Sequence, residues 1–114
     1  MTFNILDLLS SFERTTDQFL SKEEFKRRLR SRRQQRVKYT IDIKTDHLHI
    51  GHAVNLWMIR RLQDMGHKAV IVFTDSTSRM GDDDGRLETI AIYPEKTLEK
   101  KIRGLSQQAR LILK

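Results

Sequence analysis

Between residues 37 and 86 the chain reads VKYTIDIKTDHLHIGHAVNLWMIRRLQDMGHKAVIVFTDSTSRMGDDDGR. Apolar and polar residues alternate over 37–41, which predicts a strand with one well-buried face. Over 50–65 apolar residues recur at spacings of three and four, and Gly66 follows, which predicts a helix with a glycine C-cap. The run 69–73 is apolar throughout and rich in β-branched residues, so we expect a parallel strand that is covered on both faces. This order of elements is a βαβ unit.

The predicted helix begins with the sequence His49-Ile50-Gly51-His52. Two imidazoles three residues apart, next to the unpaired amides of a helix N-terminus, predict a site for the phosphates of a nucleotide. The segment 75–85 is rich in Asp, Ser, Thr and Gly, and we expect a loop at the carboxyl end of the second strand, where open α/β sheets bind ligands. The alternative for a histidine at a helix start is a simple polar cap, and we assign no more than this to His47 and His67.

Helices are also predicted on both sides of the βαβ unit. Apolar residues at helical spacing predict one over 3–12, and Ser21 followed by Glu24 has the pattern of a capping box that starts another over 22–33. We interpret these two helices as a strap over the sheet, with a partner-binding arm as the alternative. After Pro94 an apolar stripe marks a last helix. We expect the side chains of Trp57 and Met58 to lie in the core.

Positive charge is concentrated in one segment of the chain. The net charge is +7, and between residues 22 and 38 nine Lys or Arg stand against two Glu, a difference that equals the surplus of the whole chain. Such a surplus favours contact with RNA or another polyanion, whereas the alternative is a solvated helix face, because no aromatic residue interleaves the basic run. The candidates for RNA contact are Lys26, Arg27, Arg30 and Arg33.

The length of 114 residues predicts a single domain. We divide it into a helical N-terminal strap at 1–35, the βαβ core at 36–86 and a C-terminal helix at 87–114. The chain has no cysteine, which favours a reducing, intracellular setting, the cytoplasm or an organelle matrix. No apolar run is long enough to span a bilayer, so no membrane partner is expected. Three consecutive carboxylates at 82–84 do not converge on one point, and no metal site is predicted.

Several of these motifs together resemble a known family. They are Ile41-Asp42, Leu48-His49-Ile50-Gly51-His52, Met65-Gly66-His67-Lys68, Met80-Gly81-Asp82 and Gly85-Arg86. In this combination and order the chain is similar to the catalytic domain of class I aminoacyl-tRNA synthetases, most of all to the bacterial tyrosyl-tRNA synthetases. The resemblance implies a partial Rossmann-type nucleotide-binding fold of the α/β class. It also implies activation of tyrosine with ATP and its Mg²⁺, followed by transfer to tRNA.

The resemblance implies roles for individual residues. Those implied to bind ATP are Asp42, His49, Gly51 and His52, and those implied to face the amino group of the amino acid are Asp75, Thr77 and Asp82. His49 and His52 would be the catalytic pair, because they would stabilise charge on the α-phosphate as pyrophosphate leaves. Gly51 would leave room for the adenine ring, and Asp42 would lie at the floor of the crevice.

The chain also departs from the pattern of that family. Thr40 and Thr74 stand where the strands usually end in glycine, and Asp83 stands where a proline is usual. The second half of the family's catalytic domain is missing, so we expect a protein partner to cover the exposed half-sheet. Two functions follow. The first is the ATP-binding half of a tyrosyl-tRNA synthetase, incomplete and not active alone. The second is a degenerate synthetase-derived domain that is retained as a structural or RNA-binding subunit of a ribonucleoprotein assembly.

Overall fold

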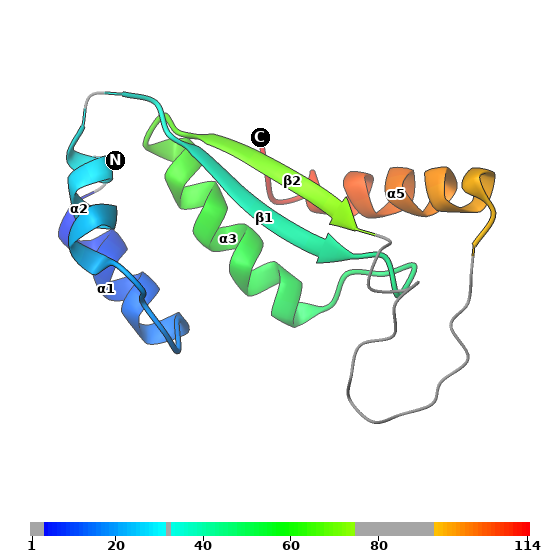
Figure 1. Ribbon diagram of the computed structural model, residues 1–114, viewed down its shortest axis with the longest axis horizontal. Helices are drawn as coiled ribbons and strands as arrows, with labels where there is room; N and C mark the ends of the chain where they lie inside the picture. Colours follow the sequence, from blue (N-terminus) through cyan, green and yellow to red (C-terminus); the bar gives the residue numbers. More distant parts are fainter. Residues whose placement is uncertain (1–3, 32, 75–92) are drawn as a thin grey trace.

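The computed structural model describes residues 4–31, 33–74 and 93–114. Its elements are α1 (Ile5–Thr15), α2 (Lys22–Arg30), β1 (Arg36–Asp42), α3 (Ile50–Asp64), β2 (Lys68–Thr74) and α5 (Glu95–Ala109). The two strands pair in parallel, as Figure 1 shows, in a register that sets Val37 opposite Ala69 and Ile41 opposite Phe73. The predicted α/β class and the βαβ unit are confirmed.

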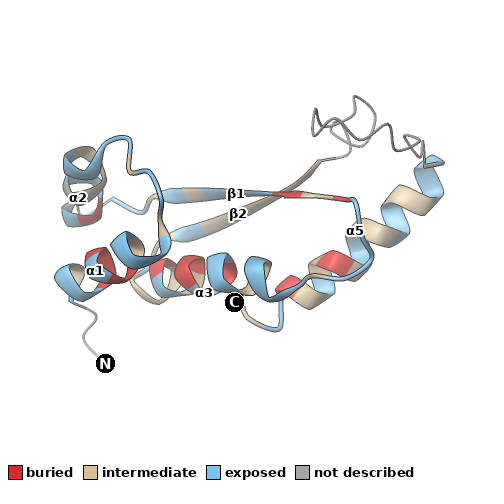
Figure 2. Ribbon diagram, turned by 90° about the horizontal axis from the view of Figure 1, so that it is seen from below, coloured by how far each residue is buried: buried red, intermediate tan, exposed pale blue. Residues whose placement is uncertain are grey.

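The helix α3 joins the two strands and lies along one face of the sheet (Figure 2). Ile41 is 2% exposed, and the amide of Asn55 on α3 donates a hydrogen bond of 3.1 Å to the hydroxyl of Tyr39. On the opposite face Lys38 and Thr40 are exposed. The prediction that β2 is covered on both faces was wrong, because six of its seven residues are half-buried and the described part of the chain places no helix over that second face.

The N-terminal helices pack beside the C-terminal half of α3. A cluster of leucines from α1, α2 and α3 forms this core, and half-buried Val37 joins it from the sheet. The buried members are Leu8, Leu9, Leu29 and Leu62. Burying side chains of this size is worth about 2 kcal/mol each, which fixes α1 and α2 in place.

The C-terminal helix α5 packs at the other end of the molecule. Leu105 and Ala109 are buried, with exposures of 1% and 3%. Beyond the helix, the carbonyl of Ile112 accepts a hydrogen bond of 2.7 Å from Arg60 on α3, and the backbone amide of Lys114 donates one of 3.0 Å to the side chain of Gln63. The last residues are therefore fixed beside α3. None of the helices in the described part is long and apolar enough to cross a membrane.

Three local predictions were wrong. Ser21 makes no side-chain cap, and Glu24 instead accepts hydrogen bonds from Arg27 and Arg28, so the predicted capping box does not form. The helix α2 ends at Arg30 rather than at residue 33. Trp57 is 56% exposed, since the buried face of α3 is formed by Leu56, Met58, Ile59 and Leu62.

Candidate functional site

The two histidines predicted to bind phosphate lie together at the first turn of α3. His49 is the N-cap residue, and its Nδ1 atom accepts a hydrogen bond of 3.1 Å from the amide of Gly51. The Nδ1 atom of His52 accepts one of 3.2 Å from the amide of His49. The two side chains therefore form a reciprocal capping box, with ring centroids 3.9 Å apart.

This capping decides which ring nitrogen carries the proton. An Nδ1 atom that accepts a hydrogen bond is unprotonated, so the proton of each neutral imidazole is assigned to Nε2. In the described part of the chain neither of these Nε2 atoms has a hydrogen-bond partner. Burial, and to a lesser degree the neighbouring His49, lower the pKa of His52 below its usual value. The site therefore offers two Nε2–H donors at the positive end of a helix dipole.

Gly51 is required for this arrangement. A Cβ atom at this position would lie 3.0 Å from Cε1 and 3.1 Å from Nδ1 of the His49 ring. A side chain here would push the ring away from its cap. The glycine thus has a local reason to be present, and its role toward adenine stays a prediction.

The segment before His49 is held by α5. The side-chain amide of Gln108 accepts a hydrogen bond of 2.8 Å from the amide of Leu48 and donates one of 2.9 Å to the carbonyl of Asp46. Both partners precede the histidine pair, so one side chain fixes the direction from which the chain enters α3. We call this contact the Gln108 clamp.

A second contact from α5 supports the same segment. The ammonium group of Lys101 forms an ion pair with Asp46 and lies 4.6 Å from the ring centroid of Tyr93. This ion pair lowers the pKa of the Asp46 carboxyl below its usual range. Because Lys101 is occupied by both neighbours, we assign it to positioning rather than to phosphate binding.

Asp42 lies half-buried at the carboxyl end of β1, and its Oδ1 atom accepts a hydrogen bond from the hydroxyl of Thr74 at the end of β2. The side chain that replaces the usual glycine in the second strand thus contacts the carboxylate implied to bind ATP. Thr40 is exposed on the uncovered face of the sheet.

The residues implied to bind the amino acid, Asp75, Thr77 and Asp82, lie outside the described residues, as does Asp83. Whether they face the histidine pair stays a prediction. Within the described ranges no three His, Asp or Glu side chains gather to hold a metal ion.

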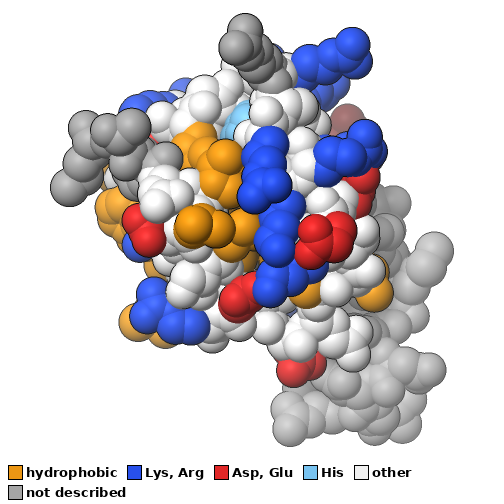
Figure 3. Space-filling model, turned by 90° about the vertical axis from the view of Figure 1, so that its left-hand side faces the viewer, with side chains coloured by type: hydrophobic (Ala, Val, Ile, Leu, Met, Phe, Trp, Pro, Cys, Tyr) orange, Lys and Arg blue, Asp and Glu red, His pale blue; other side chains and the backbone are white. Residues whose placement is uncertain are grey.

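The basic segment forms a mixed surface at the end of the molecule occupied by α1 and α2. Figure 3 shows a band of Lys and Arg side chains there, with acidic side chains beside it. Lys26 pairs with Glu23, and Arg27 pairs with Glu24. Arg30 and Arg33 are exposed and have no ion pair in the described part of the chain. RNA contact stays a prediction, and Arg30 and Arg33 are its stronger candidates.

Sequence reasoning did not find Gln108 or Lys101. They lie 60 and 55 residues from their respective partners Leu48 and Asp46, on a helix whose apolar stripe carries no sign of a polar contact. No local motif marks such residues.

Comparison with known proteins places the whole of this site within one family model. Residues 30–112 match the model of the class I tRNA synthetases (W and Y). The chain is 35% identical over 101 residues to a tyrosine–tRNA ligase of Thermotoga maritima, covering 89% of this chain and 25% of that protein. It is 32% identical to the ligase of Burkholderia thailandensis, covering 99% and 28%, and 33% identical to that of Bordetella pertussis, covering 92% and 27%. The chain thus spans about a quarter of the length of these relatives.

Proposed function

This chain belongs to the class I tRNA synthetase (W and Y) family, and we propose that it forms the ATP-phosphate-binding part of a tyrosine-activating centre. The observation that carries the proposal is the histidine pair at the start of α3. Both Nδ1 atoms are held by backbone amides, which leaves two Nε2–H donors at a helix N-terminus without partners among the described residues. Phosphate oxygens are the acceptors that such donors fit best.

The proposed chemistry is electrostatic. When tyrosine's carboxylate attacks the α-phosphate of ATP, negative charge grows on the phosphate oxygens and pyrophosphate leaves. His49 and His52 donate hydrogen bonds to these oxygens, and the α3 dipole acts in the same direction. We expect Mg²⁺ to arrive with the phosphates of ATP, because the residues of the histidine pair carry no carboxylate to bind it. Since ATP and tRNA are intracellular substrates, the proposal also implies an intracellular location, the cytoplasm or an organelle matrix.

We expect tyrosine activation to need more polypeptide than these 114 residues. The relatives named tyrosine–tRNA ligases are about four times as long as this chain. We therefore propose that the centre is completed by further polypeptide, which covers the open face of the sheet and supplies the remaining contacts to ATP, tyrosine and tRNA.

One observation favours a second candidate function. The hydrogen bond from Thr74 occupies part of the Asp42 carboxylate, at the place implied to receive ATP. Arg30 and Arg33, without ion pairs in the described ranges, provide positive charge for a polyanion. The alternative is therefore a degenerate domain that binds RNA in a ribonucleoprotein assembly and does not bind ATP.

The test is ATP binding by two matched double variants, measured by isothermal titration. His49→Asp with His52→Glu keeps side chains that cap a helix but removes both N–H donors, because ionised carboxylates only accept hydrogen bonds. His49→Ala with His52→Ala removes the caps as well. We expect both pairs to weaken ATP binding at least about tenfold, equivalent to about 1.4 kcal/mol, whereas only the alanine pair lowers the melting temperature.

Two results would contradict this proposal. One is a wild-type chain that binds no ATP while it binds RNA through Arg30 and Arg33, which would establish the alternative. The other is an Asp/Glu variant that binds ATP as tightly as the wild type. Tyrosine-dependent exchange between ATP and pyrophosphate, in the presence of the completing polypeptide, then tests the chemical step.

A further inference from the structure

The helix α3 carries a second apolar stripe, on the side away from its buried face. Ile50, Val54 and Trp57 follow one another at spacings of four and three, with exposures of 84%, 43% and 56%. These positions lie on one line along a helix. Apolar side chains gathered in this way on a surface mark a contact with another molecule more often than scattered ones do.

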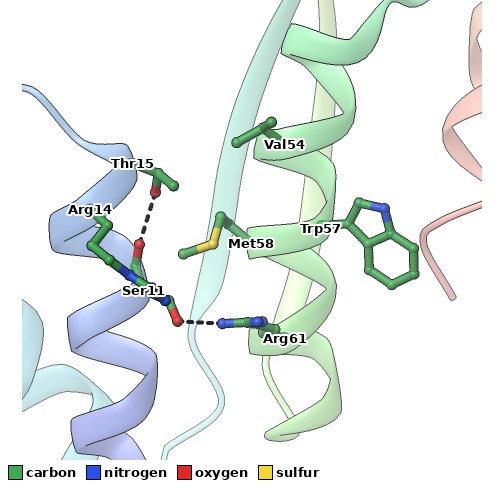
Figure 4. Close-up of a pocket in the computed structure, with 7 residues that line it drawn as sticks. All are labelled: Ser11, Arg14, Thr15, Val54, Trp57, Met58 and Arg61. Carbon is green, nitrogen blue, oxygen red and sulfur yellow. Dashed lines mark hydrogen bonds between the residues drawn. The ribbon is translucent and has the colours of Figure 1, made fainter.

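This stripe continues into a groove beside α1. The groove has a volume of about 450 Å³ and is lined by Ser11, Arg14, Thr15, Val54, Trp57, Met58 and Arg61. Figure 4 shows Val54 and Met58 extending from α3 toward α1, while Trp57 extends away from α1. The floor therefore runs from the wall formed by α1 across the outer surface of α3 to the indole.

The charged residues that line the groove are all basic. Arg61 donates a hydrogen bond of 2.5 Å to the hydroxyl of Ser11, and Arg14 has no ion pair within the described residues. Among the residues that the structure describes, no carboxylate lines the groove. The groove thus combines an apolar floor with two guanidinium groups. It complements a partner surface that is apolar in the middle and acidic at its edge.

We propose that this groove binds an amphipathic, acidic helix of a partner protein. Two helices form the groove, and a third helix packs along such a depression through apolar residues at spacings of three, four and seven. Its apolar side chains lie on Val54, Met58 and Trp57, and its carboxylates pair with Arg14 and Arg61. An oligonucleotide fits less well, because the floor offers one aromatic ring and otherwise aliphatic and thioether side chains.

Trp57 gives a direct measure of binding, since it is the one tryptophan of the sequence. The probe is a synthetic helical peptide with leucines at those spacings and two flanking glutamates, compared with a peptide in which both glutamates are lysines. We expect the acidic peptide to shift Trp57 emission to shorter wavelength, saturably, as the indole becomes buried. We expect the basic peptide to bind at least about tenfold more weakly.

Charge reversal in the protein tests the assignment of the two arginines. Arg14→Glu with Arg61→Glu should exchange the preference, so that the basic peptide binds more tightly. The matched control is Arg103→Glu on α5 with Arg110→Glu at its C-cap, which changes the net charge equally in a different hollow and should leave the preference unchanged. Arg14→Glu alone is the second variant. Arg61 also donates a hydrogen bond to Ser11, so a substitution of Arg61 removes a contact between α3 and α1, whereas Arg14→Glu leaves that contact in place.

Three outcomes would overturn the proposal. One is equal binding of the two peptides. Another is a Trp57 shift that depends on protein concentration without peptide, which would assign the groove to a second copy of the chain. The last is saturable quenching by single-stranded oligouridylate with no response to the acidic peptide.

Discussion

Histidines lie at both ends of α3, and the two ends use the imidazole ring in opposite ways. At the start, His49 and His52 accept amide hydrogen bonds through Nδ1 and keep Nε2 available for a ligand. After the end, His67 also accepts through Nδ1, from the amide of Gln35 at 3.3 Å, but its Nε2 atom is buried without a partner. Histidine thus belongs to a candidate binding site at the start of α3, whereas after its end it contributes to the packing of the chain.

The difference follows from what surrounds each end. The start of α3 is held from one side by the Gln108 clamp and is otherwise exposed. The end of α3 is enclosed by the segment between α2 and β1, where the side chain of Gln34 also donates a hydrogen bond of 2.9 Å to the carbonyl of Gly66. Substitutions at the end of α3 should therefore act on stability, and those at its start on ligand binding.

The largest effect is expected for Leu62→Ala near the end of the helix. Leu62 is 1% exposed in the leucine cluster, and its truncation should lower the free energy of unfolding by about 3 kcal/mol. The matched variant Ile50→Ala truncates a residue that is 84% exposed at the start of the helix. It should change the free energy of unfolding by less than about 0.5 kcal/mol. Urea denaturation measures both. Equal losses would show that the two ends are packed alike.

His67→Ala should be the next largest change. It leaves the half-buried amide of Gln35 without an acceptor and should cost about 2 kcal/mol in urea denaturation. His67→Asn places an amide oxygen near the position of Nδ1 and removes the buried Nε2 atom, so we expect it to cost less than half as much. If His67→Ala and His67→Asn are equally unstable, the hydrogen bond from the Gln35 amide does not account for the stability that His67 contributes.

Alanine at the glycine near the start of α3 and at the glycine just after its end should separate stability from binding. Gly66 has a φ of 93°, and Gly66→Ala should cost about 1 kcal/mol of stability without affecting ATP binding. Gly51→Ala improves helix propensity but displaces the His49 ring, so its stability should change by less than about 0.5 kcal/mol while ATP binding weakens. The reverse pattern would place the ligand site at the other end.

The smallest effect concerns pH. Burial lowers the pKa of both His52 and His67 below the usual value of 6.5. A lowered pKa in the folded state means that the unfolded chain binds the proton more readily, so this stability is complete above about pH 6.5 and is lost as pH falls toward the folded-state pKa values. Chemical denaturation between about pH 7.5 and about pH 5 should show this decline. His67→Asn should remove part of it, and an unchanged decline would assign all of it to the start of α3.

The regular elements were predictable because their signals are local. The alternation in β1, the apolar run of β2 and the spacing in α3 each lie within one short segment, and the observed bounds differ from the predicted ones by at most one residue. Which face of α3 is buried was less predictable. Apolar residues lie both on the line of Leu56, Ile59 and Leu62 and on that of Val54 and Trp57, so periodicity alone did not show which line is buried.

The site was predictable in part. The sequence identified His49 and His52 but placed the capping box at Ser21 and Glu24, which have the same spacing of three. Glu24 accepts hydrogen bonds from neighbouring arginines, and histidine is not among the usual cap residues. Neither the missing cap at Ser21 nor the observed cap at His49 therefore follows from the capping preferences of these residue types. Gln108 was not predictable, because its contact depends on how α5 packs and has no counterpart in the local sequence.

The Gln108 clamp also has a consequence for biosynthesis. A ribosome makes the histidine pair well before it makes the residue that fixes the entry to α3, which lies 60 positions after Leu48. A nascent chain can therefore form the βαβ unit early, whereas the segment before the pair stays unclamped until Gln108 has been made. The entry to α3 is thus fixed later than the sheet forms.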